Sequence, residues 1–165
     1  VRAGNVIGGG DWALDRIIPD CIRALESNKP IEIRNPKAIR PWQHVLEPLS
    51  GYMLLASKMW DEPTKYCEGW NFGPRAESIT SVWKVATKVI ENYNNRGELR
   101  DISDPDALHE ARLLMLDISK AKFLLGWEPR MNINQCVALT IDWYKGYKQN
   151  SIYELCLNEI STFLV

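Results

Sequence analysis

The stretch RAGNVIGGGDW at residues 2–12 indicates the fold class. Its β-branched pair, Val6 and Ile7, is followed at once by three glycines, a pattern typical of a short strand that enters a tight loop. Residues 15–28 come next and carry apolar side chains at the spacing of one helix face. A strand, a loop and a helix in this order predict an α/β protein.

The same alternation continues along the chain. Apolar and β-branched runs predict further short strands at residues 30–34, 40–45 and 69–72. Apolar residues at helical spacing predict helices at 47–60, 81–93, 117–125 and 134–147, with a restart near 151. Residues 101–109 are polar and predict a loop. We therefore expect an α/β fold that consists mostly of helices with short strands.

The composition is that of a globular chain of ordinary size. Its 165 residues, 45% hydrophobic and 25% charged, are enough for one domain or for part of one. A formal charge of −1 provides no general attraction for nucleic acid or an anionic membrane, so phosphate binding must come from individual arginines. No apolar run approaches the ~20 residues that cross a bilayer. The four cysteines form no C-x-x-C pair, which argues against a zinc or thioredoxin-type site and predicts reduced thiols in the cytoplasm.

The glycines at residues 8–10 allow a close approach of the backbone to phosphate oxygens. The dinucleotide fingerprint G-x-G-x-x-G is incomplete, however, because Ala13 takes the place of its third glycine and no distal acid follows. No Lys-Ser or Lys-Thr pair completes a Walker loop either. A tight structural turn is the simpler interpretation.

Arg40 lies in the apolar sequence IRPWQHV at residues 39–45. A guanidinium in such a setting needs an anion, and either a phosphate or a carboxylate of the chain matches its planar fork. His44 in the same stretch is interpreted as a hydrogen-bonded structural histidine rather than a base. Asn71, before a Gly-Pro turn, either serves a ligand or caps that turn. Two isolated histidines are too few for a metal site.

Taken in order, the motifs RAGNVIGGGDW (2–12), IRPWQHV (39–45), GWNFGP (69–74), HEA (109–111) and LGW (125–127) resemble one family. They are similar to the C-terminal half of the extended short-chain dehydrogenase/reductase enzymes that act on nucleotide sugars, and most of all to CDP-glucose 4,6-dehydratases. The resemblance implies a Rossmann-type enzyme of which residues 1–148 are the substrate-binding portion and 149–165 a C-terminal tail. It also implies that the N-terminal NAD-binding half and the catalytic Tyr-x-x-x-Lys precede this sequence, so that the chain alone is expected to be inactive. Its N-terminal strand is then expected to pair with a sheet edge of that missing half.

Tyr144 and Lys148 do show the Y-x-x-x-K spacing near the C-terminus. In short-chain dehydrogenases this pair carries the proton transfer, with the lysine lowering the tyrosine pKa. Tyr and Lys four residues apart are also common on amphipathic helices, and this copy comes too late in the chain to match the family. We expect it to be structural.

The resemblance implies a set of substrate-binding residues. Asn5 and Arg40 would hold the diphosphate, with Arg16 near the phosphates or the ribose. Ile33 would lie against the cytosine ring, and Asn71 and His109 would close the site. Arg34 and Arg75 are further cations without an assigned role. No residue of the chain is expected to be catalytic, to bind the cofactor or to bind a metal.

For the parent enzyme, the resemblance implies a cytoplasmic, homo-oligomeric lyase. It would oxidise CDP-glucose at C4 with NAD, remove water across C5–C6 and return the hydride to C6, giving CDP-4-keto-6-deoxyglucose and regenerated NAD. Two alternatives stay open: another nucleotide-sugar epimerase or dehydratase, and a non-catalytic relic that binds a nucleotide sugar or a protein.

Overall fold

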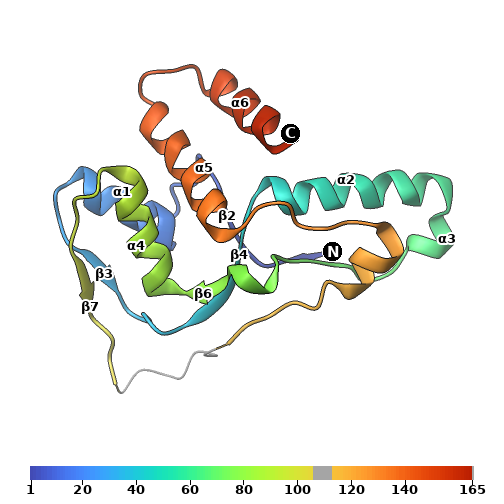
Figure 1. Cartoon of the computed structure of the whole chain (residues 1–165), viewed down its shortest axis with the longest axis horizontal. Coiled ribbons are helices and arrows are strands. Elements are labelled where there is room, and N and C mark those ends of the chain that lie inside the picture. Colours follow the sequence, from blue (N-terminus) through green and yellow to red (C-terminus); the bar gives the residue numbers. More distant parts are fainter. Residues whose placement is uncertain (106–112, 165) are drawn as a thin grey trace.

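Strand β4 (Ile39–His44) is central to the computed structural model, which describes residues 1–105 and 113–164 (Figure 1). Strand β2 (Asn5–Ile7) pairs with it in parallel, with Asn5 opposite Trp42. Strand β6 (Ile79–Ser81) pairs antiparallel on its other side, with Ile39 opposite Ser81. The order β2-β4-β6 therefore places the predicted strand at 40–45 between two others.

Two smaller parallel pairs complete the described strands. Strand β1 (Arg2–Ala3) pairs with β5 (Asn71–Phe72), and β3 (Ile31–Ile33) pairs with β7 (Leu99–Asp101). The N-terminal strand thus finds partners within the chain, whereas we expected its partner in a missing half. Strand β7 begins just before the predicted polar loop, and β6 was not predicted, because three residues show no readable period of two.

The first core lies between α1 (Ile17–Glu26), α4 (Val82–Tyr93), α5 (Ile133–Gly146) and β3. Helix α1 contributes the inward positions predicted from its spacing, and Cys21 and Ile22 are fully buried. Burial of one such side chain stabilises the fold by roughly 1.5–3 kcal/mol. Helix α4 begins at Ser81, whose hydroxyl accepts a hydrogen bond from Lys84 N at 3.3 Å, as expected for an N-cap.

The second core lies around α2 (Leu46–Asp61), α3 (Pro63–Tyr66), β5 and η2 (Ala121–Leu125). Among its aromatic contacts, Phe72 packs against Trp127 edge to face at 5.0 Å. The short 3-10 helix η1 (Ala76–Ser78) lies between β5 and β6 in the chain and leads directly into β6. The short π-helical turn η2 replaces the ordinary helix predicted at 117–125, and it ends at Gly126, whose φ of 68° is the left-handed conformation expected there.

A buried carboxylate joins α2 to the segment that precedes α5. Glu47 is 1% exposed, and its Oε1 accepts hydrogen bonds from Arg130 N at 2.8 Å and Met131 N at 2.6 Å. Burial raises the pKa of Glu47 above its ordinary value, although these two hydrogen bonds oppose the shift. The carboxylate thus satisfies two backbone donors that would otherwise be left unpaired.

The C-terminal stretch without a recognisable motif forms α6 (Ile152–Leu164), which folds back beside α5 (Figure 1). Phe163 joins the first core at 8% exposure, and Arg130 Nη1 donates to the Phe163 carbonyl at 3.2 Å. Residues 149–164 therefore contribute to the packed structure.

Two features predicted from the composition are the lack of a membrane-spanning helix and the state of the cysteines. In the described ranges, no helix has both the length and the apolar character needed to cross a membrane. All four cysteines are free thiols, and Cys21 and Cys136 are buried. Burial raises the pKa of both of these thiols to about 12, so neither is a reactive nucleophile.

Candidate functional site

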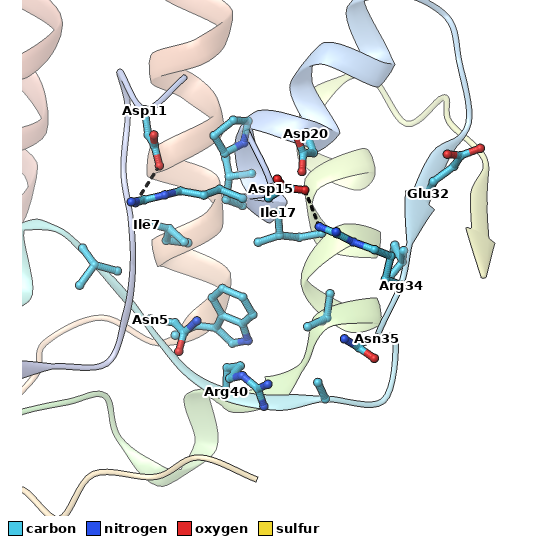
Figure 2. A pocket seen from close by; sticks show the side chains of 18 of the residues that line it. Asn5, Ile7, Asp11, Asp15, Ile17, Asp20, Glu32, Arg34, Asn35 and Arg40 are labelled. Atoms are coloured by element: carbon cyan, nitrogen blue, oxygen red, sulfur yellow. Dashed lines mark hydrogen bonds and ion pairs between the residues drawn. The ribbon is translucent and has the colours of Figure 1, made fainter. Parts of the chain in front are cut away.

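A pocket of about 380 Å3 opens beside the β2–β4 pair, and four of the six predicted site residues line it: Asn5, Arg16, Ile33 and Arg40 (Figure 2). Its walls come from β2, β4, the end of β3 and the first turn of α1. The pocket runs along β2 from Asn5 to the loop after it and along the first residues of β4. Asn5 and Arg40, which belong to two of the sequence motifs, thus meet Arg16 and Ile33 at one place.

Arg40 stands in the wall of the pocket. Its position on β4 leaves it 8% exposed, and its Nη1 donates to the Ile39 carbonyl at 3.0 Å. Trp42, two residues further along the same strand, also lines the pocket and donates from Nε1 to the Thr80 carbonyl at 3.0 Å. The pocket thus combines a buried cation with an aromatic wall, which suits an anionic ligand that also carries a ring.

Asn5 and Ile33 approach the pocket from different strands. Asn5 is half-buried at the start of β2, where it supplies a polar amide. Ile33 is 2% exposed at the end of β3 and belongs to the first core as well as to the pocket wall. Asn5 thus brings a polar amide and Ile33 an apolar side chain to the same pocket as Arg40, and their contacts with a ligand stay predictions.

The N-terminus of α1 also lines the pocket. The residues Arg16, Ile17 and Ile18 all lie at its edge, and no side chain caps the helix. Uncapped N–H groups at a helix start attract anions, because the helix dipole places partial positive charge there. This second positive feature lies in the same cavity as Arg40.

Carboxylates accompany the arginines of the pocket. Asp11 accepts a hydrogen bond from Arg16 at 3.3 Å, and Asp15 accepts one from Arg34 at 2.6 Å, as the dashed lines in Figure 2 show. The sequence did not single out these two aspartates. Only sequence position could have indicated them. Asp11 lies four residues after the predicted strand at 2–7, and Arg34, the partner of Asp15, ends the predicted strand at 30–34.

Of the remaining two predicted residues, Asn71 is not among the residues that line this pocket. Asn71 lies on β5 opposite Arg2, and its Nδ2 donates to the Asp117 carbonyl at 3.1 Å. His109 lies outside the described residues. The roles of both stay predictions.

The glycine loop accommodates side chains of the chain itself. A Cβ on Gly9 would lie 2.1 Å from Cγ of Trp143, and one on Gly8 would lie 2.8 Å from Cγ1 of Val45. The space that a glycine-rich loop offers to a dinucleotide pyrophosphate is therefore taken by Trp143. This loop is therefore packed against the chain's own side chains and leaves no room for a pyrophosphate at Gly9.

Tyr144 and Lys148 are structural, as expected. Tyr144 is 2% exposed and donates from its hydroxyl to the Asp11 carbonyl at 2.5 Å, and burial raises its pKa to about 12. A catalytic tyrosine needs a lowered pKa. Lys148 Nζ instead pairs with Glu26 Oε1 at 2.7 Å. Both side chains of this pair are thus engaged with other groups of the chain.

His44 is also structural. It is fully buried, Leu46 N donates to its Nδ1 at 3.4 Å, and burial lowers its pKa to about 4. The described residues contain no group of three or more His, Cys, Asp or Glu that could hold a metal ion.

The chain was compared with known proteins. No protein-family model matches the chain. A CDP-glucose 4,6-dehydratase of Salmonella typhimurium strain LT2 is 44% identical over 165 residues, which are 99% of this chain and 46% of that protein. The chain is similar to part of a CDP-glucose 4,6-dehydratase. The resemblance inferred from the motifs is thereby confirmed, and the chain spans about half the length of the curated relative that it matches.

Solved structures of related enzymes share the fold. A dTDP-glucose 4,6-dehydratase of Bacillus anthracis in complex with NAD matches with a TM-score of 0.73 at 19% identity, over 90% of this chain and 44% of that one. A UDP-glucuronic acid 4-epimerase of Bacillus cereus, in complex with UDP-glucuronic acid and NAD, matches with a TM-score of 0.72 at 18% identity, over 88% of this chain and 44% of that one. The predicted fold class, an α/β fold like that of part of these enzymes, is confirmed.

Proposed function

We propose that this chain is the substrate-binding portion of a CDP-glucose 4,6-dehydratase, with residues 1–148 as the binding unit and 149–165 as its C-terminal tail. One observation carries the proposal. Asn5, Arg16, Ile33 and Arg40 line a single pocket in a chain that is 44% identical to such an enzyme.

The pocket suits a nucleoside diphosphate sugar. Arg40 and the uncapped start of α1 attract the diphosphate, and Asn5 adds a hydrogen-bond donor. A hydrogen bond between a guanidinium and a phosphate contributes about 1.5–3 kcal/mol. Ile33 offers its apolar side chain to the cytosine ring. We retain Asn71 and His109 as the proposed residues that close the site.

For the whole enzyme we propose the lyase reaction that converts CDP-glucose to CDP-4-keto-6-deoxyglucose with loss of water. NAD, which is bound in both related structures described above, would take up the hydride from C4 and return it to C6. Within this proposal, the chain's own part is to bind and orient the substrate. We further propose that the enzyme is cytoplasmic and homo-oligomeric.

Calorimetric titration of the 165-residue chain tests the proposal. We expect CDP-glucose to bind more tightly than dTDP-glucose, and NAD not to bind. Arg40→Ala should weaken CDP-glucose binding about tenfold or more, because it removes a charge-assisted contact in a partly buried site. The affinity of Arg40→Lys for CDP-glucose should lie between those of Arg40→Ala and the unchanged chain, because lysine keeps the charge but lacks the planar fork.

Arg96→Ala is the matched control, because Arg96 is exposed and lies outside the pocket. It should bind CDP-glucose like the unchanged chain. Preference for a UDP or dTDP sugar would instead favour another nucleotide-sugar epimerase or dehydratase. Absence of binding to every nucleotide sugar would overturn the proposal that this chain forms the binding site.

A further inference from the structure

An ion pair joins two segments of the pocket that are far apart in sequence. Arg34 Nη2 donates to Asp15 Oδ1 at 2.6 Å; Asp15 precedes α1 and Arg34 follows β3. Figure 2 shows the two side chains pointing toward one another. Both residues line the pocket. The side chains of Arg34 and Asp15 are 65% and 74% exposed, so the pair stands at the rim of the pocket.

Arg16 at the same rim is held in the same way, by Asp11 at 3.3 Å. Exposed pairs of this kind are weak, because water screens the charges and both side chains lose freedom in forming them. A phosphoryl oxygen that reaches the guanidinium can therefore take the place of the carboxylate. A ligand with anionic phosphoryl groups can do so at Arg34, whereas a nucleoside cannot.

We propose that Arg34 is a specificity-determining residue that binds the diphosphate, and that Asp15 holds it until a diphosphate displaces the carboxylate. The inference rests on the proposed function and extends it, because neither Arg34 nor Asp15 had a role there. Asp15 competes with any ligand for Arg34. Only a ligand that brings its own negative charge can replace the ion pair that Arg34 gives up. The pair thus selects nucleoside diphosphates over nucleosides.

The backbone at Asp15 offers a clean way to test this. Its φ is 61°, a left-handed conformation that asparagine adopts at least as readily as aspartate. Asp15→Asn therefore removes the charge without disturbing the turn before α1. The variant separates the electrostatic role of Asp15 from any structural one.

The experiment measures the affinity of the full chain for CDP-glucose, CDP, inorganic pyrophosphate and cytidine. Asp15→Asn should tighten binding of the three phosphate compounds about threefold, because the competing carboxylate is gone. Arg34→Ala should weaken them about tenfold. The double variant should bind like Arg34→Ala alone, since Asp15 acts only through Arg34. Cytidine binding should change in none of them.

Glu26→Gln is the control, because it breaks the exposed Lys148–Glu26 pair outside the pocket and should leave every affinity unchanged. The inference is overturned if Asp15→Asn does not tighten binding, if Arg34→Ala does not weaken it, or if no phosphate compound binds the unchanged chain. A different outcome concerns the proposed function alone. If another nucleoside diphosphate sugar is preferred to CDP-glucose and shows the same response to both variants, the inference stands and the assignment to CDP-glucose fails.

Discussion

Gly9 is a position where one added methyl group should destabilise the fold. Its backbone lies against the ring of Trp143, and a Cβ would stand 2.1 Å from Cγ, close to the fixed end of that side chain. Trp143 is 6% exposed and stacks on Tyr147 at 5.6 Å, so it has little room to move. We expect Gly9→Ala to lower the free energy of unfolding by about 1–3 kcal/mol, as overpacking does, measured by urea denaturation.

Gly69→Ala provides the comparison. A Cβ at Gly69 would meet no atom within 4 Å, and its φ is not positive. This variant should stay within about 0.5 kcal/mol of the unchanged chain. Equal stability of the two variants would show that Trp143 does not occupy the glycine loop.

Among the secondary-structure elements, β4 and α6 meet through two buried titratable groups. His44 Nε2 and Glu159 Oε1 are 3.9 Å apart, and neither atom has a hydrogen-bond partner among the described residues. Burial lowers the pKa of His44 to about 4 and, with the charge of Asp142, raises the pKa of Glu159 to about 7. Both groups are therefore neutral in the fold between these values.

The sign of each contribution follows from the two shifts. In the unfolded chain, the ordinary pKa values are 6.5 for His44 and 4.5 for Glu159. The contribution of His44 therefore increases the stability of the fold as the pH rises from 4 to 6.5. The contribution of Glu159 decreases the stability of the fold as the pH rises from 4.5 to 7. The two slopes cancel where these ranges overlap. Glu159→Gln should remove the second one, so the variant should gain up to about 3 kcal/mol relative to the unchanged chain between pH 4.5 and 7.

Denaturant unfolding at a series of pH values checks this. Glu154→Gln is the control, because Glu154 is exposed on the same helix. Its unfolding free energy should follow that of the unchanged chain at every pH. A pH-independent difference between Glu159→Gln and the unchanged chain would refute the expectation.

Elements with a long repeating pattern were predictable from the sequence, and those defined by a partner were not. The inward positions of α1, such as Ile18 and Ile22, follow a period of 3.6 that is visible without any structure. Strand β6 is a strand only because Ile79 lies opposite Pro41, a pairing that three residues cannot announce. Helix α3 is one turn long and was missed for the same reason.

At the scale of the whole molecule, the candidate site likewise contains residues that the sequence predicted and residues that it did not. Asn5 and Arg40 were predicted together from two motifs, and the β2–β4 pairing accounts for their meeting. The Asp15–Arg34 pair was not predicted, because it joins residues 19 apart whose separation depends on how α1 packs on β3. Tertiary contacts between charged residues leave no periodic trace in the sequence.

A stripe of apolar side chains on α2 predicts self-association of the chain. Leu49, Met53 and Trp60 lie on one helix face and are 43%, 68% and 89% exposed. In the described part of the chain, β1 and β2 also pair on one side only. We expect the apparent mass in sedimentation or light scattering to rise with concentration.

The double variant Met53→Lys/Trp60→Lys should shift this equilibrium toward monomer, because it places two charges on the stripe. Tyr153→Lys, at a position 68% exposed on α6, is the control and should associate like the unchanged chain. A sharp melt of a monomer at every concentration would contradict the prediction.

Strand β4 touches more of the molecule than its six residues suggest. Arg40 faces the pocket, Trp42 belongs to the first core, and Gln43 donates from Nε2 to the Phe72 carbonyl of the second core at 2.9 Å. Because successive side chains of a strand alternate between faces, an inserted or deleted residue here would exchange all these neighbours at once. During evolution, changes in chain length should therefore accumulate in the loops around β4, while the strand itself keeps its length.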